Sequence, residues 1–141
     1  MKEAAVKFAT KIALVIRSDL DSWQKLNVAA FLASGIAGAF PECVGEGYED
    51  ASATHYHALI GEPILIYGGD RPALTRALER AIARKVTAAV YTEEMFATTH
   101  DAANRATVKA VALPDLNLVG LGFRAERKTI DKVVDGLKFH A

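Results

Sequence analysis

Acidic side chains that could take part in catalysis follow two apolar segments of the chain. Asp19 comes soon after the apolar run at residues 12–16, and Glu93 follows a shorter segment that ends near residue 91. Ligand sites in α/β folds lie at the carboxyl ends of strands. Asp19 could therefore act as a base or hold a ligand's amine, and Glu93 could complete an acidic pair with it. The structural alternative is that these carboxylates cap or begin helices.

Residues just beyond Asp19 could provide a binding surface. Trp23 lies in the turn, where an exposed indole is a stacking surface, and Asn27 offers both a donor and an acceptor one helical turn later. The alternative for Trp23 is to pack as a hydrophobic lid over the start of the helix. We predict that Trp23 and Asn27 bind a ligand together with Lys25, the only basic residue of this helix.

The segment 42–60 has no sustained periodicity and predicts a long loop, which in a compact domain is often functional. His55 and His57 form an HxH pair, and with an acid such as Asp50 they could bind a metal. No third ligand stands at a diagnostic position, so no metal site is predicted. His57 as a general acid or base fits chemistry at neutral pH better.

The single cysteine, Cys43, excludes an internal disulfide framework and any multi-cysteine metal site. A thiol triad could be drawn from Cys43, one of the histidines and Asp50. Nothing around Cys43 matches a cysteine-nucleophile signature, and a lone loop cysteine is usually inert. We therefore assign it no catalytic role.

The hydrophobic patterns alternate between strands and helices. Residues 12–16 are apolar at successive positions, which fits a strand covered on both faces. An N-cap at Asp21 or Ser22 then opens a helix that Pro41 stops. Further strands are predicted at 64–67, 87–91 and from 116, and further helices after Asp70, within 93–111, where Asp101 could start a new helix, and through 130–137. This order predicts one three-layer α/β/α domain over residues 1–141.

The composition is that of a globular protein, with 51% hydrophobic and 24% charged residues. Seventeen Lys and Arg balance seventeen Asp and Glu, so no bulk field attracts a polyanion, and nucleic acid is not expected as a partner. No apolar run approaches the ~20 residues that cross a bilayer. The first residues include Glu3 and lack the apolar region of a secretory signal. We expect a cytoplasmic protein without membrane association.

Three stretches carry a family resemblance that covers most of the chain. They are KIALVIRSDL with the following NVAAFLA, the unit GEPILIYGGDRPALTRALERA, and the ending GLGFRAERKTIDKVVDGLKF. On these stretches the chain resembles the type II peptidyl-tRNA hydrolase superfamily, and within it a bacterial domain family of unknown function. SWQKLNVAAF and YTEEMFATT are similar to that uncharacterised family and not to the hydrolases. The resemblance implies a four-stranded mixed sheet, its last strand antiparallel to the rest, with helices on both faces.

The motifs that mark the hydrolases are replaced in this chain. The hydrolases carry a glycine- and lysine-rich turn after their first strand and an Asp-Ala-Gly-x-Thr motif after their third. Here the turn reads DSWQKLN, with Asn27 near the position of the family's essential lysine and Lys25 displaced from it, and YTEEMF follows the third strand. Clustered cations that would neutralise phosphates are also missing from the first turn and the long loop. We therefore expect no peptidyl-tRNA hydrolysis.

These observations predict a protein that binds or hydrolyses a small molecule at the carboxyl end of the first strand, without a cofactor. If it is an enzyme, it is hydrolase-like. The alternative is a non-catalytic dimeric or regulatory protein, a homodimer that keeps the scaffold without the chemistry.

The site hypothesis places all but one of the candidate side chains in one pocket. The ends of the first and third strands should point the same way, and the polar loop between them needs partners for its side chains. Asp19, His57 and Glu93 are the catalytic candidates. The residues expected to line the pocket are Asp19, Trp23, Asn27, His57 and Glu93.

Overall fold

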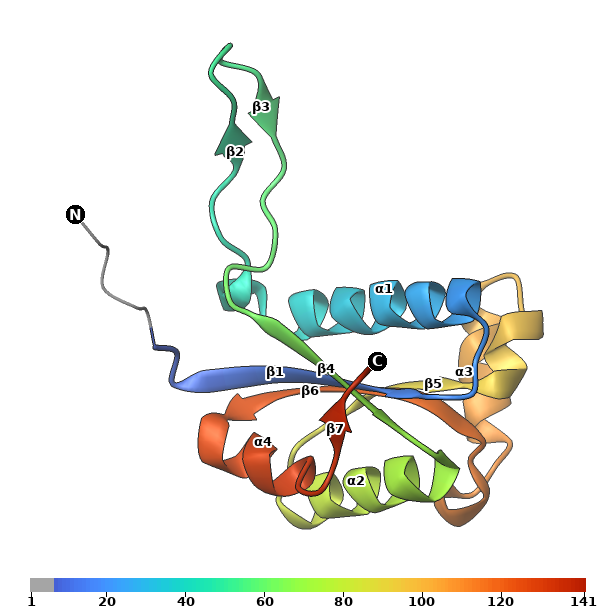
Figure 1. Ribbon diagram of the computed structural model, residues 1–141. Helices are drawn as coiled ribbons and strands as arrows, with labels where there is room; N and C mark the ends of the chain where they lie inside the picture. Colours follow the sequence, from blue (N-terminus) through green and yellow to red (C-terminus); the bar gives the residue numbers. More distant parts are fainter. Residues whose placement is uncertain (1–6) are drawn as a thin grey trace.

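The computed structural model describes residues 7–141, which form a five-stranded mixed sheet with helices on both faces (Figure 1). The strands of this sheet are β1 (Thr10–Arg17), β4 (Ile64–Gly69), β5 (Ala89–Thr92), β6 (Leu118–Glu126) and β7 (Lys138–Phe139). The helices are α1 (Ser22–Ala39), α2 (Arg71–Ala83), α3 (Asp101–Lys109) and α4 (Arg127–Val133). Short elements are the 3-10 turns η1 (Pro41–Cys43), η2 (Glu93–Ala97) and η3 (Leu113–Asp115), and the small strands β2 (Tyr48–Glu49) and β3 (His55–Tyr56).

The sheet has the order β5-β6-β1-β4-β7, with β1 at its centre. β1 pairs in parallel with β4 and antiparallel with β6, and β5 is antiparallel to β6. β6 corresponds to the strand predicted from residue 116, and its antiparallel direction is as expected. Because β1 and β5 both oppose β6, they run the same way, and their carboxyl ends meet at one edge of the sheet.

The sheet has five strands rather than the four predicted, because the end of the chain adds β7. The predicted last helix was expected to include Leu137, but α4 ends at Val133 and Gly136 turns the chain with a φ of +85°. β7 then pairs antiparallel with β4, and Phe139 stacks on Tyr67 with ring centroids 5.1 Å apart. A two-residue strand has no readable period, so the hydrophobic pattern could not reveal it.

Alternate side chains of β1 enter two separate cores. Leu14 and Ile16 pack against α1 on one face of the sheet, whereas Ala13 and Val15 join the core formed with α2 and α4 on the other. Successive strand residues point to opposite faces. The continuous apolar run in the sequence is therefore the pattern that a centrally placed, doubly covered strand requires, and the predicted α/β class is confirmed.

Local capping signals set the starts of the helices. Asp21 precedes α1, and its backbone N–H donates to Gln24 Oε1 at 3.0 Å. Asp70 precedes α2 and accepts the N–H of Ala73 at 2.9 Å. α3 begins at Asp101, the residue predicted to start a new helix. The N-cap positions expected at Asp21 and Asp70 are thus confirmed. α3 is capped by His100, whose Nδ1 accepts the N–H of Ala103 at 3.2 Å, and the region 93–111 divides into η2 and α3.

The segment predicted as a long loop contains a hairpin, residues 44–60, which we call the arm. A bridge between Val44 and Ile60 closes its base, and β2 pairs with β3 near its tip. Asp50 accepts hydrogen bonds from the Tyr56 hydroxyl, at 2.8 Å, and from two backbone N–H groups of the tip. The Tyr56 hydroxyl, followed by these N–H groups, holds the pKa of Asp50 below its usual value. Figure 1 shows the arm standing away from the sheet beyond the C-terminal end of α1.

Candidate functional site

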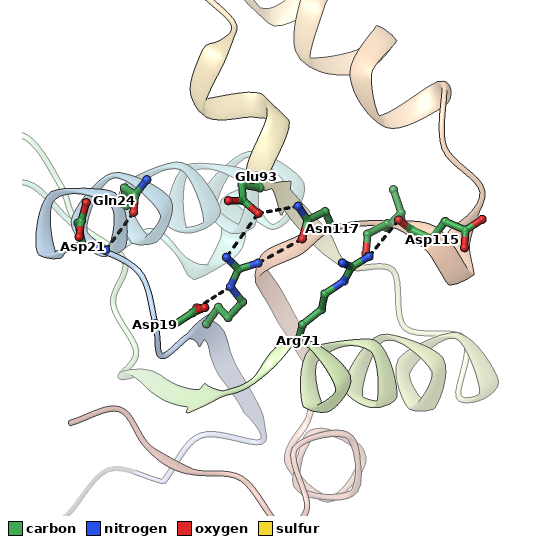
Figure 2. Close-up of polar contacts among 9 residues, drawn as sticks. Asp19, Asp21, Gln24, Arg71, Glu93, Asp115 and Asn117 are labelled. Atoms are coloured by element: carbon green, nitrogen blue, oxygen red, sulfur yellow. Dashed lines mark hydrogen bonds and ion pairs between the residues drawn. The ribbon is translucent and has the colours of Figure 1, made fainter.

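Arg17, the last residue of β1, is the centre of a polar cluster at the carboxyl edge of the sheet. Its partners Asp19, Glu93 and Asn117 are labelled in Figure 2. Its Nε donates to Asp19 Oδ1 at 2.6 Å, and its Nη1 donates to Asn117 Oδ1 at 3.2 Å. Its Nη2 lies 3.5 Å from Glu93 Oε2, to which Asn117 Nδ2 also donates at 2.6 Å. Only 12% of the Arg17 side chain is exposed. Three acceptors therefore fix the guanidinium in one orientation.

Strand direction explains why these residues meet. Arg17 ends β1, Glu93 follows β5, and β1 and β5 run in the same direction. Asn117 directly precedes β6, which runs the opposite way and so begins at the same edge. A backbone hydrogen bond of 3.0 Å from the Glu93 N–H to the Asn117 carbonyl ties the two segments together. The cluster is thus built on the ends of sheet strands rather than on a free loop.

A cavity of about 400 Å³ opens beside this cluster. Arg71, at the start of α2, contributes a second guanidinium, whose Nη2 donates to the carbonyls of Asp115 and Leu116 at 3.3 and 3.4 Å (Figure 2). The cavity therefore combines cations with carboxylates that have oxygens to spare. Its lining residues are Arg17, Ser18, Asp19, Asp70, Arg71, Glu93 and Asn117.

The structure brings together two of the predicted site residues, Asp19 and Glu93, and separates two others from them. Trp23 packs edge-on against Phe96 with ring centroids 5.7 Å apart, and 59% of it remains exposed. Asn27 Nδ2 donates to the Tyr91 hydroxyl at 3.3 Å. Trp23 and Asn27 thus contact an aromatic cluster beside α1 and do not line the Arg17 cavity.

His57 and Lys25 also lie outside the Arg17 cavity. His57 follows β3 in the arm and is exposed, and the arm leaves the domain beyond the opposite end of α1 from Asp19 (Figure 1). Lys25 lines a different cavity, of about 370 Å³, together with His140. The expected single pocket does not form. The physical reason is that residues 44–60 pair with one another as a hairpin, so their polar groups need no partner at the sheet edge.

Arg17, Arg71 and Asn117 are the site residues that the sequence patterns did not single out. Each stands at the boundary of an apolar segment, where polar residues are common and therefore do not indicate a function. A charge argument could have found Arg17, because two carboxylates predicted at one sheet edge, Asp19 and Glu93, call for a cation between them.

The other side chains considered for chemistry have structural surroundings. Cys43 is buried against Ile12 and Ile36, and this burial raises the pKa of its thiol, which disfavours a nucleophilic thiolate. His55 lies 3.7 Å from Glu49 across the arm. In the described part of the chain, no group of three or more His, Cys, Asp or Glu side chains could hold a metal ion.

Comparison with known proteins identifies the family. The profile described as "Protein of unknown function (DUF2000)" matches residues 10–141. The chain belongs to this family. A solved structure of Atu0240, a protein of unknown function from Agrobacterium tumefaciens strain C58, is similar over 96% of this chain and 100% of its own, with 44% identity and a TM-score of 0.93. No functionally curated protein matches the chain.

Membership of DUF2000 confirms the prediction that the chain belongs to an uncharacterised domain family. The family description assigns no activity. The match begins at Thr10, the first residue of β1, so the matched region contains the whole sheet, the arm and the Arg17 cavity. Among the helices of residues 7–141, none is both long enough and apolar enough to cross a membrane.

Proposed function

We propose that this DUF2000 protein binds a small zwitterionic molecule in the Arg17 cavity. The observation that carries the proposal is the fixed orientation of Arg17 by Asp19, Glu93 and Asn117 at the carboxyl end of β1. A rigid charged group at a strand end, beside a cavity of about 400 Å³, has the properties of a ligand site in an α/β fold.

The type of ligand follows from the side chains of the cavity that can still accept or donate hydrogen bonds. Asp19 uses Oδ1 for Arg17 and Asp70 uses Oδ1 for the N–H of Ala73, so each has a second oxygen to accept from a ligand's ammonium. Arg71 uses one terminal nitrogen for backbone carbonyls, and the rest of its guanidinium can donate to a carboxylate. A molecule with both an amine and a carboxylate, such as an amino acid, satisfies both sides.

Binding fits this site better than hydrolysis does. Asp19 and Glu93 are both engaged with Arg17, and His57, the expected general acid or base, lies in the arm. A group that is to accept a proton from water must reach that water. Hydrolysis is therefore the second candidate function. A non-catalytic regulatory role ranks with it, because Asn27 lies near the position of the hydrolases' essential lysine.

The finer scaffold assignment is also part of the proposal: the sheet is of the type II peptidyl-tRNA hydrolase kind. The parallel β1–β4 pair, the antiparallel β6 and the KIALVIRSDL stretch support it. Superposition of an experimental structure of this protein on such a hydrolase tests it. A different order of the four longer strands would contradict the assignment.

The ligand proposal is tested by thermal unfolding in the presence of amino acids and related small zwitterions. A ligand at 100 times its dissociation constant stabilises the protein by about 2.7 kcal/mol. We expect this shift to disappear in Arg17→Met and in Asp19→Asn. The Asp19 side chain is 72% exposed, so the fold should tolerate its replacement. Arg76→Met, on the exposed side of α2, is the matched control and should respond like the wild type.

Two outcomes would contradict the ligand proposal. One is the absence of any stabilisation across the zwitterion set. The other is a shift that survives unchanged in both cavity variants, because the ligand would then bind elsewhere.

A further inference from the structure

α1 is apolar on the side that it turns to solvent as well as on the side that it buries. Trp23, Leu26 and Phe31 are 59%, 73% and 53% exposed, and Lys25 is the only charged residue in the helix. Surface helices of globular proteins carry polar residues on the outer face, whereas helices that are apolar all round are normally buried. The outer face of α1 therefore has the composition of an interface.

The arm has the same character. Tyr48 and Tyr56 are each 54% exposed and Leu59 is 62% exposed, although all three lie on a projecting two-stranded hairpin. A hairpin without further packing is marginally stable in water. The arm is therefore expected to be covered when the protein is assembled.

We propose that two copies of the chain associate through these two surfaces as a symmetric dimer. α1 and the arm form the two limbs of an L in Figure 1. Their lengths match, since the 18 residues of α1 span about 27 Å and about eight residues on each side of the arm span about 26 Å. A two-fold axis perpendicular to α1 sets the two helices antiparallel, and each arm then passes the N-terminal end of the other copy's α1. A parallel pairing would instead crowd both arms at one end.

The surface that receives the partner's arm suits it in shape and charge. Beside α1 lies a groove of about 690 Å³, lined by apolar side chains such as Phe31, Tyr91 and Val108. The exposed charged residues at its border are Arg105, Lys109 and Asp101, and Asp101 forms an ion pair with Arg105. The arm presents aromatic residues and, across residues 44–60, carries three acidic residues and no Lys or Arg. An acidic aromatic arm is complementary to an apolar groove whose rim, with two cations and one carboxylate, carries a net positive charge.

The area also favours a dimer that uses the arm. The outer face of α1, the arm and the receiving surface each offer a strip about 26 Å long and about 10 Å wide. Together these strips approach the roughly 800 Å² per partner of a stable interface. α1 alone would supply about a third of that area, so the arm is needed for the dimer to hold.

The oligomeric state measured by sedimentation velocity or light scattering tests the proposal. The wild type should be a dimer at micromolar concentration. Ala30→Arg places a long cation on the exposed side of α1 and should give a monomer, and so should replacement of residues 46–58 by an Asn-Gly turn. Ala83→Arg, the same change at an exposed alanine of α2, is the matched control and should remain dimeric.

Circular dichroism of the monomeric variants must match that of the wild type. A monomeric wild type would overturn the proposal and assign these surfaces to a different partner. A dimer that persists in Ala30→Arg or in the arm replacement would also overturn it, because the contact would then use another face. The zwitterion test uses other residues, so either proposal can fail without the other.

Discussion

Two arginines show how the surroundings of a side chain decide between a binding role and a structural one. Arg17 meets its acceptors at the mouth of a cavity, where it can also face a ligand. Arg124 instead meets Glu62, whose side chain is 4% exposed and also accepts the Thr10 hydroxyl at 2.8 Å. Arg124 further lies over the ring of Phe40, 5.1 Å from its centroid. This second cluster connects the base of the arm to the sheet. Its charged groups are engaged with one another, so we assign it a structural role.

Removal of the buried carboxylate should therefore be costly. In Glu62→Ala, Arg124 and Thr10 lose their shared acceptor, and the loss should be about 3 kcal/mol of unfolding free energy, as for other broken buried pairs. Glu42→Ala is the control, because Glu42 lies 3.4 Å from the same guanidinium but is 63% exposed, and it should cost less than about 1 kcal/mol. Urea unfolding measures both. Equal losses would mean that burial does not set the strength of this cluster.

At the scale of elements, the approach of α1 to the sheet depends on a glycine in β6. A Cβ at Gly120 would lie 2.4 Å from Val28 Cγ1 and 2.9 Å from Leu32 Cδ1. Gly120→Ala should therefore force α1 outward and destabilise the protein by about 1–3 kcal/mol. Gly38→Ala, where a Cβ meets nothing within 4 Å, should be neutral or stabilising by up to about 1 kcal/mol. A fall in thermal midpoint for Gly38→Ala but not Gly120→Ala would contradict this account of the packing.

The elements that could be predicted from the sequence are those with a local cause. The apolar run of β1, the cap at Asp70 and the new helix at Asp101 each leave a pattern within a few residues. β7 and the arm depend on pairing between distant or very short segments, and the patterns did not reveal them. The same division holds at the site. The strand-end rule indicated Asp19 and Glu93, whereas the contacts of Arg17 with Glu93 and Asn117 depend on the strand order.

At the scale of the whole molecule, the charge of this protein argues against the activity of the type II peptidyl-tRNA hydrolases, whose scaffold we propose for it. The chain has no net charge, and a protein that holds tRNA must neutralise several phosphates with clustered cations. At the carboxyl edge of the sheet, the Arg17 cavity contains two arginines and three carboxylates. The arm adds acids and no Lys or Arg. These surfaces repel a polyanion more than they attract it.

The purified protein should therefore release no peptide from peptidyl-tRNA above background, even at low salt, where electrostatic binding is strongest. A type II peptidyl-tRNA hydrolase assayed in parallel shows that the substrate is competent. If peptide release were observed, variants would have to show that this protein catalyses it. Turnover that disappears in Lys25→Ala or Asp19→Ala would assign peptidyl-tRNA hydrolysis to the protein, whereas turnover that persists in both variants would indicate a contaminating hydrolase. Since Lys25 lies outside the Arg17 cavity and Asp19 lies within it, the two variants also distinguish which of these regions would act on the ester.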